Sequence, residues 1–304
     1  MTVTADAVPT RLLKSSAKQS YDPDVDVDWD APLVDGLWFM QPERLSLYGT
    51  PLWDGLTEEQ RRELSRHEVA SIAGVGLWFE LILMQLMVRE LYDADPRSPR
   101  SQYALTEIGD ECRHSVMFGR FIDTLGVPAY RPSPRVHRLG RGFKALASGV
   151  SGYAAILVAE EILDRWQREL MRDDRVQPLV RMVSRIHVLE EARHMSFARE
   201  QITRQVPTLS RRSLGWHRTL TANTAFVVAR SLVDPRVYAA VGLDPHEARR
   251  QALANPHYRQ TLTWMGERVV GFLGEQGLIG RAQRPTWRRS LLMPDCGCVR
   301  PGQR

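Results

Sequence analysis

The phrase EEARH stands at Glu190–His194, and a matching phrase, DECRH, stands at Asp110–His114. Both read acid, glutamate, small residue, arginine, histidine, and Glu111 and Glu191 are 80 positions apart. Within each copy the glutamate and the histidine are three residues apart, so on a helix they lie one turn apart on the same face. The repeat predicts two copies of one helical unit, each of which directs a glutamate and a histidine toward a common centre.

The 80-residue register extends upstream of the two phrases. Glu80 lies 31 residues before Glu111, and Glu160 lies 31 residues before Glu191. The neighbouring Glu161 is an alternative candidate for this position, but the 31-residue spacing favours Glu160. The register holds for three pairs, which are Glu80 and Glu160, Glu111 and Glu191, and His114 and His194. A duplicated helix pair explains this pattern, with one glutamate on the first helix and Glu-x-x-His on the second.

The surroundings of Glu80 and Glu160 are apolar. Glu80 stands near the centre of GVGLWFELILMQLMV (residues 74–88), and Glu160 follows YAAILVA (residues 153–159). A helix that is apolar on every side is buried, and a buried carboxylate is costly unless it is paired or bound to a metal. One such glutamate is most simply the partner of a buried arginine. Four glutamates and two histidines in register favour a metal site.

His187 adds a seventh group. At about 100° per residue, His187, Glu191 and His194 lie at about 0°, 40° and −20° around a helix, on one stripe. The equivalent position in the first copy is Glu107, so His187 breaks the symmetry of the repeat. We predict that His187 also faces the metals.

Long helical patterns separated by short connections predict an all-α fold, an antiparallel four-helix bundle with additional C-terminal helices and flexible termini. The four bundle helices are expected over residues 57–92, 98–125, 143–172 and 176–205, with a Pro/Arg-rich crossover at 130–141. The additional helices are expected over residues 211–233, 246–254 and 258–276.

Three regions follow from these patterns: a partly disordered N-terminal extension (1–56), the bundle domain (57–280) and a C-terminal tail (281–304). The stretch YDPDVDVDWDAP (residues 21–32) is predicted to be a solvated extension, because its aspartates repel one another. Cys296 and Cys298 are predicted to belong to a flexible tail, and Cys112 to pack between helices.

Composition narrows the class of protein. The chain has 41 basic and 36 acidic residues, for a net charge of +5, but its arginines are scattered. A nucleic-acid partner is therefore not expected. No uncharged apolar run reaches the roughly 18 residues of a membrane span, and no secretory signal opens the chain. We expect a cytoplasmic protein without a membrane partner.

The ordered ligand series, over about residues 57–280, resembles the p-aminobenzoate N-oxygenase family of non-haem di-iron oxygenases, which have a ferritin-like helical core and three histidines at the site. The resemblance implies two iron ions, with Glu111 and Glu160 as the candidate bridging ligands. It implies that seven residues bind the metals and act in catalysis through them: Glu80, Glu111, His114, Glu160, His187, Glu191 and His194.

The resemblance also implies a reaction. Dioxygen would be activated at the reduced metal pair and the nitrogen of an arylamine oxidised to a hydroxylamine or nitro group. An external electron donor, a reductase or a small electron carrier, would be needed, since no flavin or nicotinamide fingerprint is present. A homodimer is expected. An arylamine, an aliphatic amine or a C–H bond remain open as the substrate.

Four charged residues beside the ligands are candidates for orienting the imidazoles from outside, with solvated helix-face charge as the alternative. They are Asp110, Arg113, Glu190 and Arg193. Four aromatic residues could line a substrate pocket, although helical spacing more often places such residues in a core. They are Trp78, Phe79, Trp166 and Phe197.

Three other functions fit the same residues. The protein could be a ferritin-like iron-binding or ferroxidase protein in which the metal is cargo. It could be a di-manganese catalase or oxidase, because these ligands do not select iron over manganese. It could be a helical interaction protein with vestigial ligands, which the intact set of seven disfavours.

Overall fold

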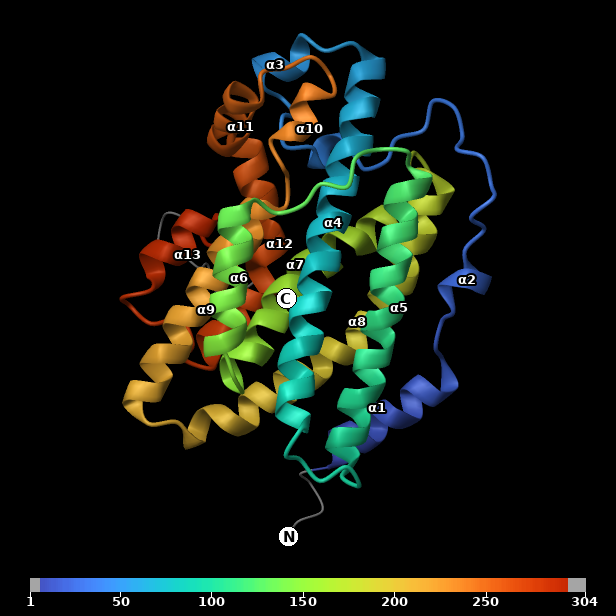
Figure 1. Ribbon diagram of the computed structural model, residues 1–304. Helices are drawn as coiled ribbons and strands as arrows, with labels where there is room; N and C mark the ends of the chain where they lie inside the picture. Colours follow the sequence, from blue (N-terminus) through green and yellow to red (C-terminus); the bar gives the residue numbers. More distant parts are fainter. Residues whose placement is uncertain (1–5, 295–304) are drawn as a thin grey trace.

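The structure, a computed structural model, describes residues 6–294 of the chain (Figure 1). The predicted cysteine pair, Cys296 and Cys298, lies outside the described residues. Within residues 6–294 the chain is all-α, and its one β contact is an isolated bridge between Trp38 and Val176. This confirms the predicted fold class.

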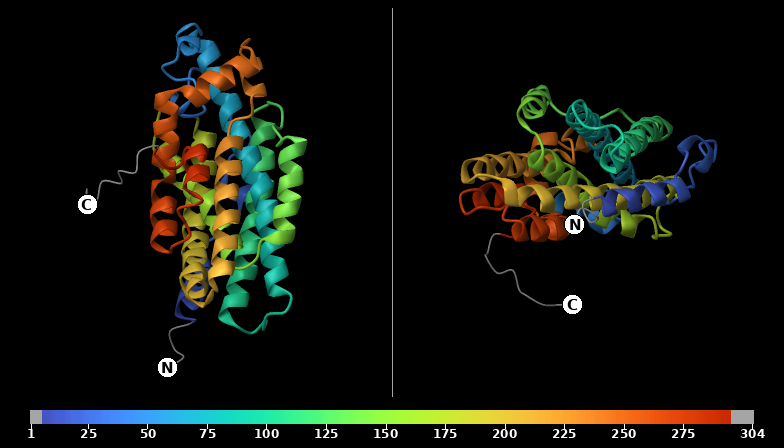
Figure 2. Two further views of the ribbon diagram at one scale, coloured as in Figure 1. Left: turned by 90° about the vertical axis from the view of Figure 1, so that its left-hand side faces the viewer. Right: turned by 90° about the horizontal axis from the view of Figure 1, so that it is seen from below.

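The core of the fold is a bundle of four long helices. They are α4 (Glu58–Leu91), α5 (Pro99–Thr124), α7 (Val150–Leu170) and α8 (Pro178–Gln205). Helix α4 packs against α5 and α7, and α8 packs against the same two helices, so the four form a closed ring. Figure 2 shows most of the long helices running along a common direction. One face of each bundle helix therefore points into a shared interior.

Local signals set the ends of the first two bundle helices. The Thr57 hydroxyl accepts a hydrogen bond from the Gln60 amide, and the Gln60 side chain accepts one from the Thr57 amide. This reciprocal capping box fixes the start of α4. Ser98 caps α5 in the same way through its side chain. After α5, Gly126 adopts a left-handed conformation, with φ of 63°, that favours glycine at a helix end.

The predicted third helix, residues 143–172, is wrong in its first part. The crossover contains a separate helix, α6 (Pro134–Leu146), and α7 begins only at Val150. Pro134 occupies the first turn of α6, where a missing amide hydrogen costs nothing. Gly149, with φ of 47°, breaks the path between the two helices. Pro134, in the stretch predicted to be a loop, therefore starts a helix.

The additional helices confirm the predicted pattern. They are α9 (Arg211–Ser231), α11 (Pro245–Ala254) and α12 (Pro256–Glu275), together with short α10 (Arg236–Ala239). Helices α9 and α12 pack on α7 from outside the ring. Inside the stretch assigned to the C-terminal tail, α13 (Arg284–Ser290) packs on α9 and buries Trp287.

The N-terminal segment packs on the bundle, which corrects the prediction of a solvated extension. Helix α1 (Ala7–Lys18) contacts α5 and α8, and α2 (Pro23–Asp26), η1 (Pro42–Arg44) and α3 (Pro51–Asp54) follow. The aspartates at 22–30 are exposed, but Pro23, Val27 and Trp29 between them are buried. Alternation of acidic and apolar residues lets one side of this segment face water and the other face the core.

Helix α4 is long and apolar enough, by length and composition, to cross a membrane, with a mean hydropathy of 1.8 over 18 residues. In the fold 56% of that window is buried. The absence of a membrane partner stays a prediction.

Candidate metal centre

The structure brings the seven predicted ligands together inside the bundle. Each of the four helices contributes at least one of them, and every one of the seven side chains is buried, with at most 2% of its surface exposed. Glu80 comes from α4, Glu111 and His114 from α5, Glu160 from α7, and His187, Glu191 and His194 from α8. The register read from the sequence therefore corresponds to one cluster in space.

Two glutamates lie between two of the histidines. One oxygen of Glu191 is 3.1 Å from Nδ1 of His114 and 3.0 Å from Nδ1 of His194. Glu111 places one oxygen 3.0 Å from Nδ1 of His114 and the other 3.1 Å from Nδ1 of His194. These two carboxylates thus lie between His114 and His194, where they could bridge two metal ions. Glu160, which the resemblance suggests as a bridge, lies beside His187.

His187 faces the other two glutamates. Its Nε2 atom is 3.5 Å from Glu80 and 3.6 Å from Glu160, and it makes no hydrogen bond within the described residues. Its Nδ1 atom lies 2.8 Å from the side-chain oxygen of Gln167, to which it donates. This bond assigns the ring proton to Nδ1 and leaves the lone pair of Nε2 directed toward the carboxylates.

The four charged residues flanking the ligands surround the imidazoles. Nε2 of His114 is 2.9 Å from Glu190, and Nε2 of His194 is 3.1 Å from Asp110. Arg193 lies 3.3 Å from Glu190 and 3.5 Å from Asp110, so it links the two carboxylates. Arg113 forms a further ion pair with Asp110. Such contacts from outside fix the orientation and tautomer of a metal-binding histidine.

Sequence reasoning missed three groups at the site. Gln167 orients His187, and the backbone amide of Tyr21 donates to Glu190 over 3.1 Å. Glu107 is buried beside Glu111 and His194. No pattern in the sequence points to Gln167 or Tyr21. The 80-residue register does point to Glu107, because it is the counterpart of His187.

The protonation of the cluster follows from burial and close charges. Burial and the neighbouring carboxylates raise the pKa of Glu80 and Glu160. Burial opposes charging of His114 and His194, but the surrounding carboxylates outweigh it and raise the pKa of both. Burial, the larger effect, lowers the pKa of His187 to about 4. Without a metal, protons held at this cluster would offset the carboxylate charge.

The donor set fits a pair of metal ions. Several buried side-chain atoms that face the cluster have no hydrogen-bond partner within the described residues: Glu80 Oε2, Glu111 Oε1, Glu160 Oε2, Glu191 Oε2 and His187 Nε2. Possible ligand atoms fall into two groups, each within 4.8 Å: Glu80, His114, His187 and Glu191, and Glu107, Glu111 and His194. Carboxylate oxygens and imidazole nitrogens together suit iron or manganese.

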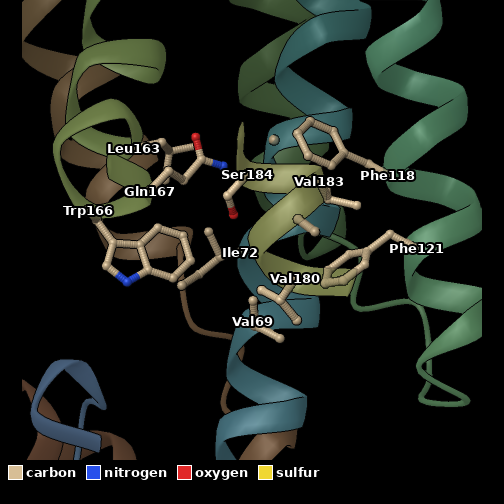
Figure 3. Close-up of a pocket in the computed structure, with 12 residues that line it drawn as sticks. Val69, Ile72, Phe118, Phe121, Leu163, Trp166, Gln167, Val180, Val183 and Ser184 are labelled. Carbon is tan, nitrogen blue, oxygen red and sulfur yellow. The ribbon is translucent and has the colours of Figure 1, made fainter. Parts of the chain in front are cut away.

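A small apolar cavity adjoins the His187 side of the cluster. It measures about 20 Å³ and is lined from all four bundle helices, with Gln167 and Ser184 as its polar residues (Figure 3). One of its walls is Phe118, whose ring centre is 5.0 Å from that of His187. This volume holds about one molecule of the size of water or dioxygen.

Of the four aromatic residues considered for a substrate pocket, Trp166 lines this cavity. Phe79 and Phe197 are buried in the main hydrophobic core. Trp78 is half-buried and packs against the ring of His137 on α6.

Comparisons with known proteins identify a family for the chain. The sequence model of the family described as "P-aminobenzoate N-oxygenase AurF" matches residues 3–277. An uncharacterized protein of Mycobacterium bovis and uncharacterized proteins of two strains of Mycobacterium tuberculosis are similar to the chain. Each is 28% identical to it over 290 residues, which is 91% of this chain and 84% of the relative.

Proposed function

Because the chain belongs to the p-aminobenzoate N-oxygenase AurF family of di-iron oxygenases, we propose that it oxidises the nitrogen of a small amine, with an arylamine as the first candidate. The observation that supports this most directly is the buried cluster of four glutamates and three histidines. We propose iron as the metal in preference to manganese because the family is a di-iron family.

The proposed reaction has a simple balance. The amine, dioxygen, two electrons and two protons give a hydroxylamine and water. A second dioxygen then oxidises the hydroxylamine to the nitro compound and water. A pair of iron ions, when bound, supplies the electron-transfer chemistry that dioxygen reduction requires. The two external electrons come from a reductase or a small electron carrier.

The residues of the chain have separable tasks in this proposal. Glu111 and Glu191 would hold the two metal ions, because each contacts both His114 and His194. Gln167 keeps Nε2 of His187 directed into the cluster. Burial excludes bulk water, which strengthens every charge interaction at the site.

The apolar cavity suggests how dioxygen reaches the cluster. Dioxygen is small and apolar, and the cavity lies against His187 and is lined mostly by apolar side chains. An aromatic amine is too large for about 20 Å³, so its binding requires displacement of side chains such as Trp166 or Phe118.

We further propose that the chain forms a homodimer through α4 and α5. Cys112, expected to pack between helices, is exposed, and its sulfur lies 3.4 Å from that of Met84 on α4. Further exposed apolar side chains lie on the same two helices: Leu81 and Val88 on α4, Tyr92 directly after it, and Leu105 and Val116 on α5. Exposed apolar side chains that gather on one face favour a protein interface. Sedimentation should show a dimer that Val88→Lys dissociates and that Val34→Lys, at an exposed valine beside Gln177, leaves intact.

The test of function is single-turnover oxidation. Protein loaded anaerobically with ferrous iron is mixed with ¹⁸O₂ and p-aminobenzoate, or with an aliphatic amine of similar size, and the products are identified by mass spectrometry. We expect ¹⁸O on the amine nitrogen, and no product from Glu111→Ala. Oxidised product in that variant would remove the cluster from the chemistry.

The same samples distinguish the proposed oxygenase from a ferritin-like iron-storage protein and from a di-manganese enzyme. Many iron ions per chain in a large cage, without product, would support iron storage. Turnover that requires manganese would support a di-manganese catalase or oxidase.

A further inference from the structure

Glu107 occupies the place in α5 that His187 occupies in α8. Each stands four residues before the glutamate of its Glu-x-x-His sequence, so each lies on the same helix face as its neighbours. Glu107 is 1% exposed. A ligand oxygen of Glu107 lies within 4.8 Å of ligand atoms of both Glu111 and His194. The helix pair therefore directs a metal-binding side chain inward at this position in both halves.

No hydrogen bond within the described residues satisfies this buried carboxylate. Both oxygens of Glu107 are buried, and neither has a hydrogen-bond partner in residues 6–294. The hydroxyl of Tyr103, one helical turn earlier on α5, also has no partner among these residues. A buried carboxylate that lacks a hydrogen bond is costly.

We propose that Glu107 is an eighth metal ligand, on the position that it shares with Glu111 and His194. This inference rests on the proposed two-metal site. His187 serves the other position, with Glu80, His114 and Glu191. The two positions therefore differ in donors, since a carboxylate stands on one side where an imidazole stands on the other.

The fifth carboxylate also changes the charge of the loaded site. It lowers the net charge of the cluster by one, and in a buried site this stabilises the higher oxidation state of the metals relative to the lower one. A neutral replacement should therefore raise the reduction potential of the pair.

The test compares metal binding by wild-type protein with binding by Glu107→Ala and Glu107→His. Ferrous iron is titrated anaerobically into the chelator-treated full chain, and bound metal is counted after gel filtration. We expect wild type to bind two ions, Glu107→Ala to bind the second ion at least about 10-fold more weakly, and Glu107→His to recover it. As a matched control, Glu161→Ala removes a buried glutamate that pairs with Arg199, and it should still bind two ions.

The outcomes are distinct. Two ions bound by Glu107→Ala with wild-type affinity would overturn the inference, and far-UV circular dichroism of the metal-free variants separates lost binding from lost folding. If wild type binds two ions but oxidises no amine, the proposed function fails while the Glu107 assignment is still decided by the titration. If wild type binds no metal, both fail together.

Discussion

Nε2 of His194 lies 3.1 Å from a carboxylate oxygen of Asp110, and both side chains are buried. The bond directs the other ring nitrogen toward Glu111 and Glu191. Asp110→Asn keeps the shape but removes the charge that orients the ring, so metal affinity should fall about 10- to 100-fold. Isothermal titration measures the change. Asp123→Asn, at an exposed position of the same helix, should bind metal as wild type does, and equal affinities for the two variants would contradict this role of Asp110.

Metal removal should destabilise the protein. A ligand that binds only the folded state stabilises it by about 2.7 kcal/mol at 100 times its dissociation constant. Chelation should therefore lower the melting temperature by several degrees, measured by circular dichroism. In Glu191→Ala, which lacks a carboxylate shared by His114 and His194, chelation should change the melting temperature little. A wild-type melting temperature that chelation does not change would mean that the cluster holds no metal.

Two glycines on neighbouring helices should respond in opposite directions to alanine. A Cβ on Gly74 of α4 would lie 2.6 Å from the backbone oxygen of Tyr130, so Gly74→Ala should destabilise the fold by about 1–3 kcal/mol. At Gly109 of α5 the nearest atom is the end of Arg113 at 4.0 Å, so Gly109→Ala should stabilise by about 0.5–1 kcal/mol. Urea unfolding of metal-free protein measures both. Equal changes in the free energy of unfolding for the two variants would show that the Tyr130 backbone does not restrict the space at Gly74.

Glu68 should make stability depend on pH. It is fully buried, and its oxygens accept hydrogen bonds from the hydroxyl and the amide of Ser46. Burial, only partly offset by these bonds, raises the pKa of Glu68 from 4.5 to about 7. The folded state thus favours the protonated form, and stability falls as pH rises from about 4.5 to about 7.

Glu68→Gln removes this dependence while keeping the shape of the protonated acid. The variant should match wild type near pH 4 and exceed it by up to about 3 kcal/mol at pH 8. Urea unfolding of the metal-free proteins at several pH values provides the measurement. A variant that is less stable than wild type at pH 8 would show that Glu68 is ionised and paired in the fold.

Much of the bundle and its ligands could be predicted because both are periodic. The equal spacing of Glu80 and Glu111, and of Glu160 and Glu191, indicates that a pair of helices is duplicated in the sequence. A capping box marks the start of α4. Such signals are local or repeated, so they are visible without coordinates.

The remaining features depend on contacts between distant segments. Gln167 reaches His187 only because α7 packs on α8. The burial of Val27 and Trp29 in the acidic segment depends on packing of this segment against the bundle, which its composition does not reveal. Which glutamates lie between His114 and His194 depends on side-chain positions that spacing alone does not determine.

The bond between the Tyr21 amide and Glu190 joins residues 169 positions apart. Contacts of such long range form late, because most of the chain must already be ordered before its ends can meet. We therefore expect the first segment of the chain to close over the outside of the imidazole network after α8 has taken its place. A bulky fusion ahead of α1 is then expected to weaken the contact between Tyr21 and Glu190 and to leave the bundle itself intact.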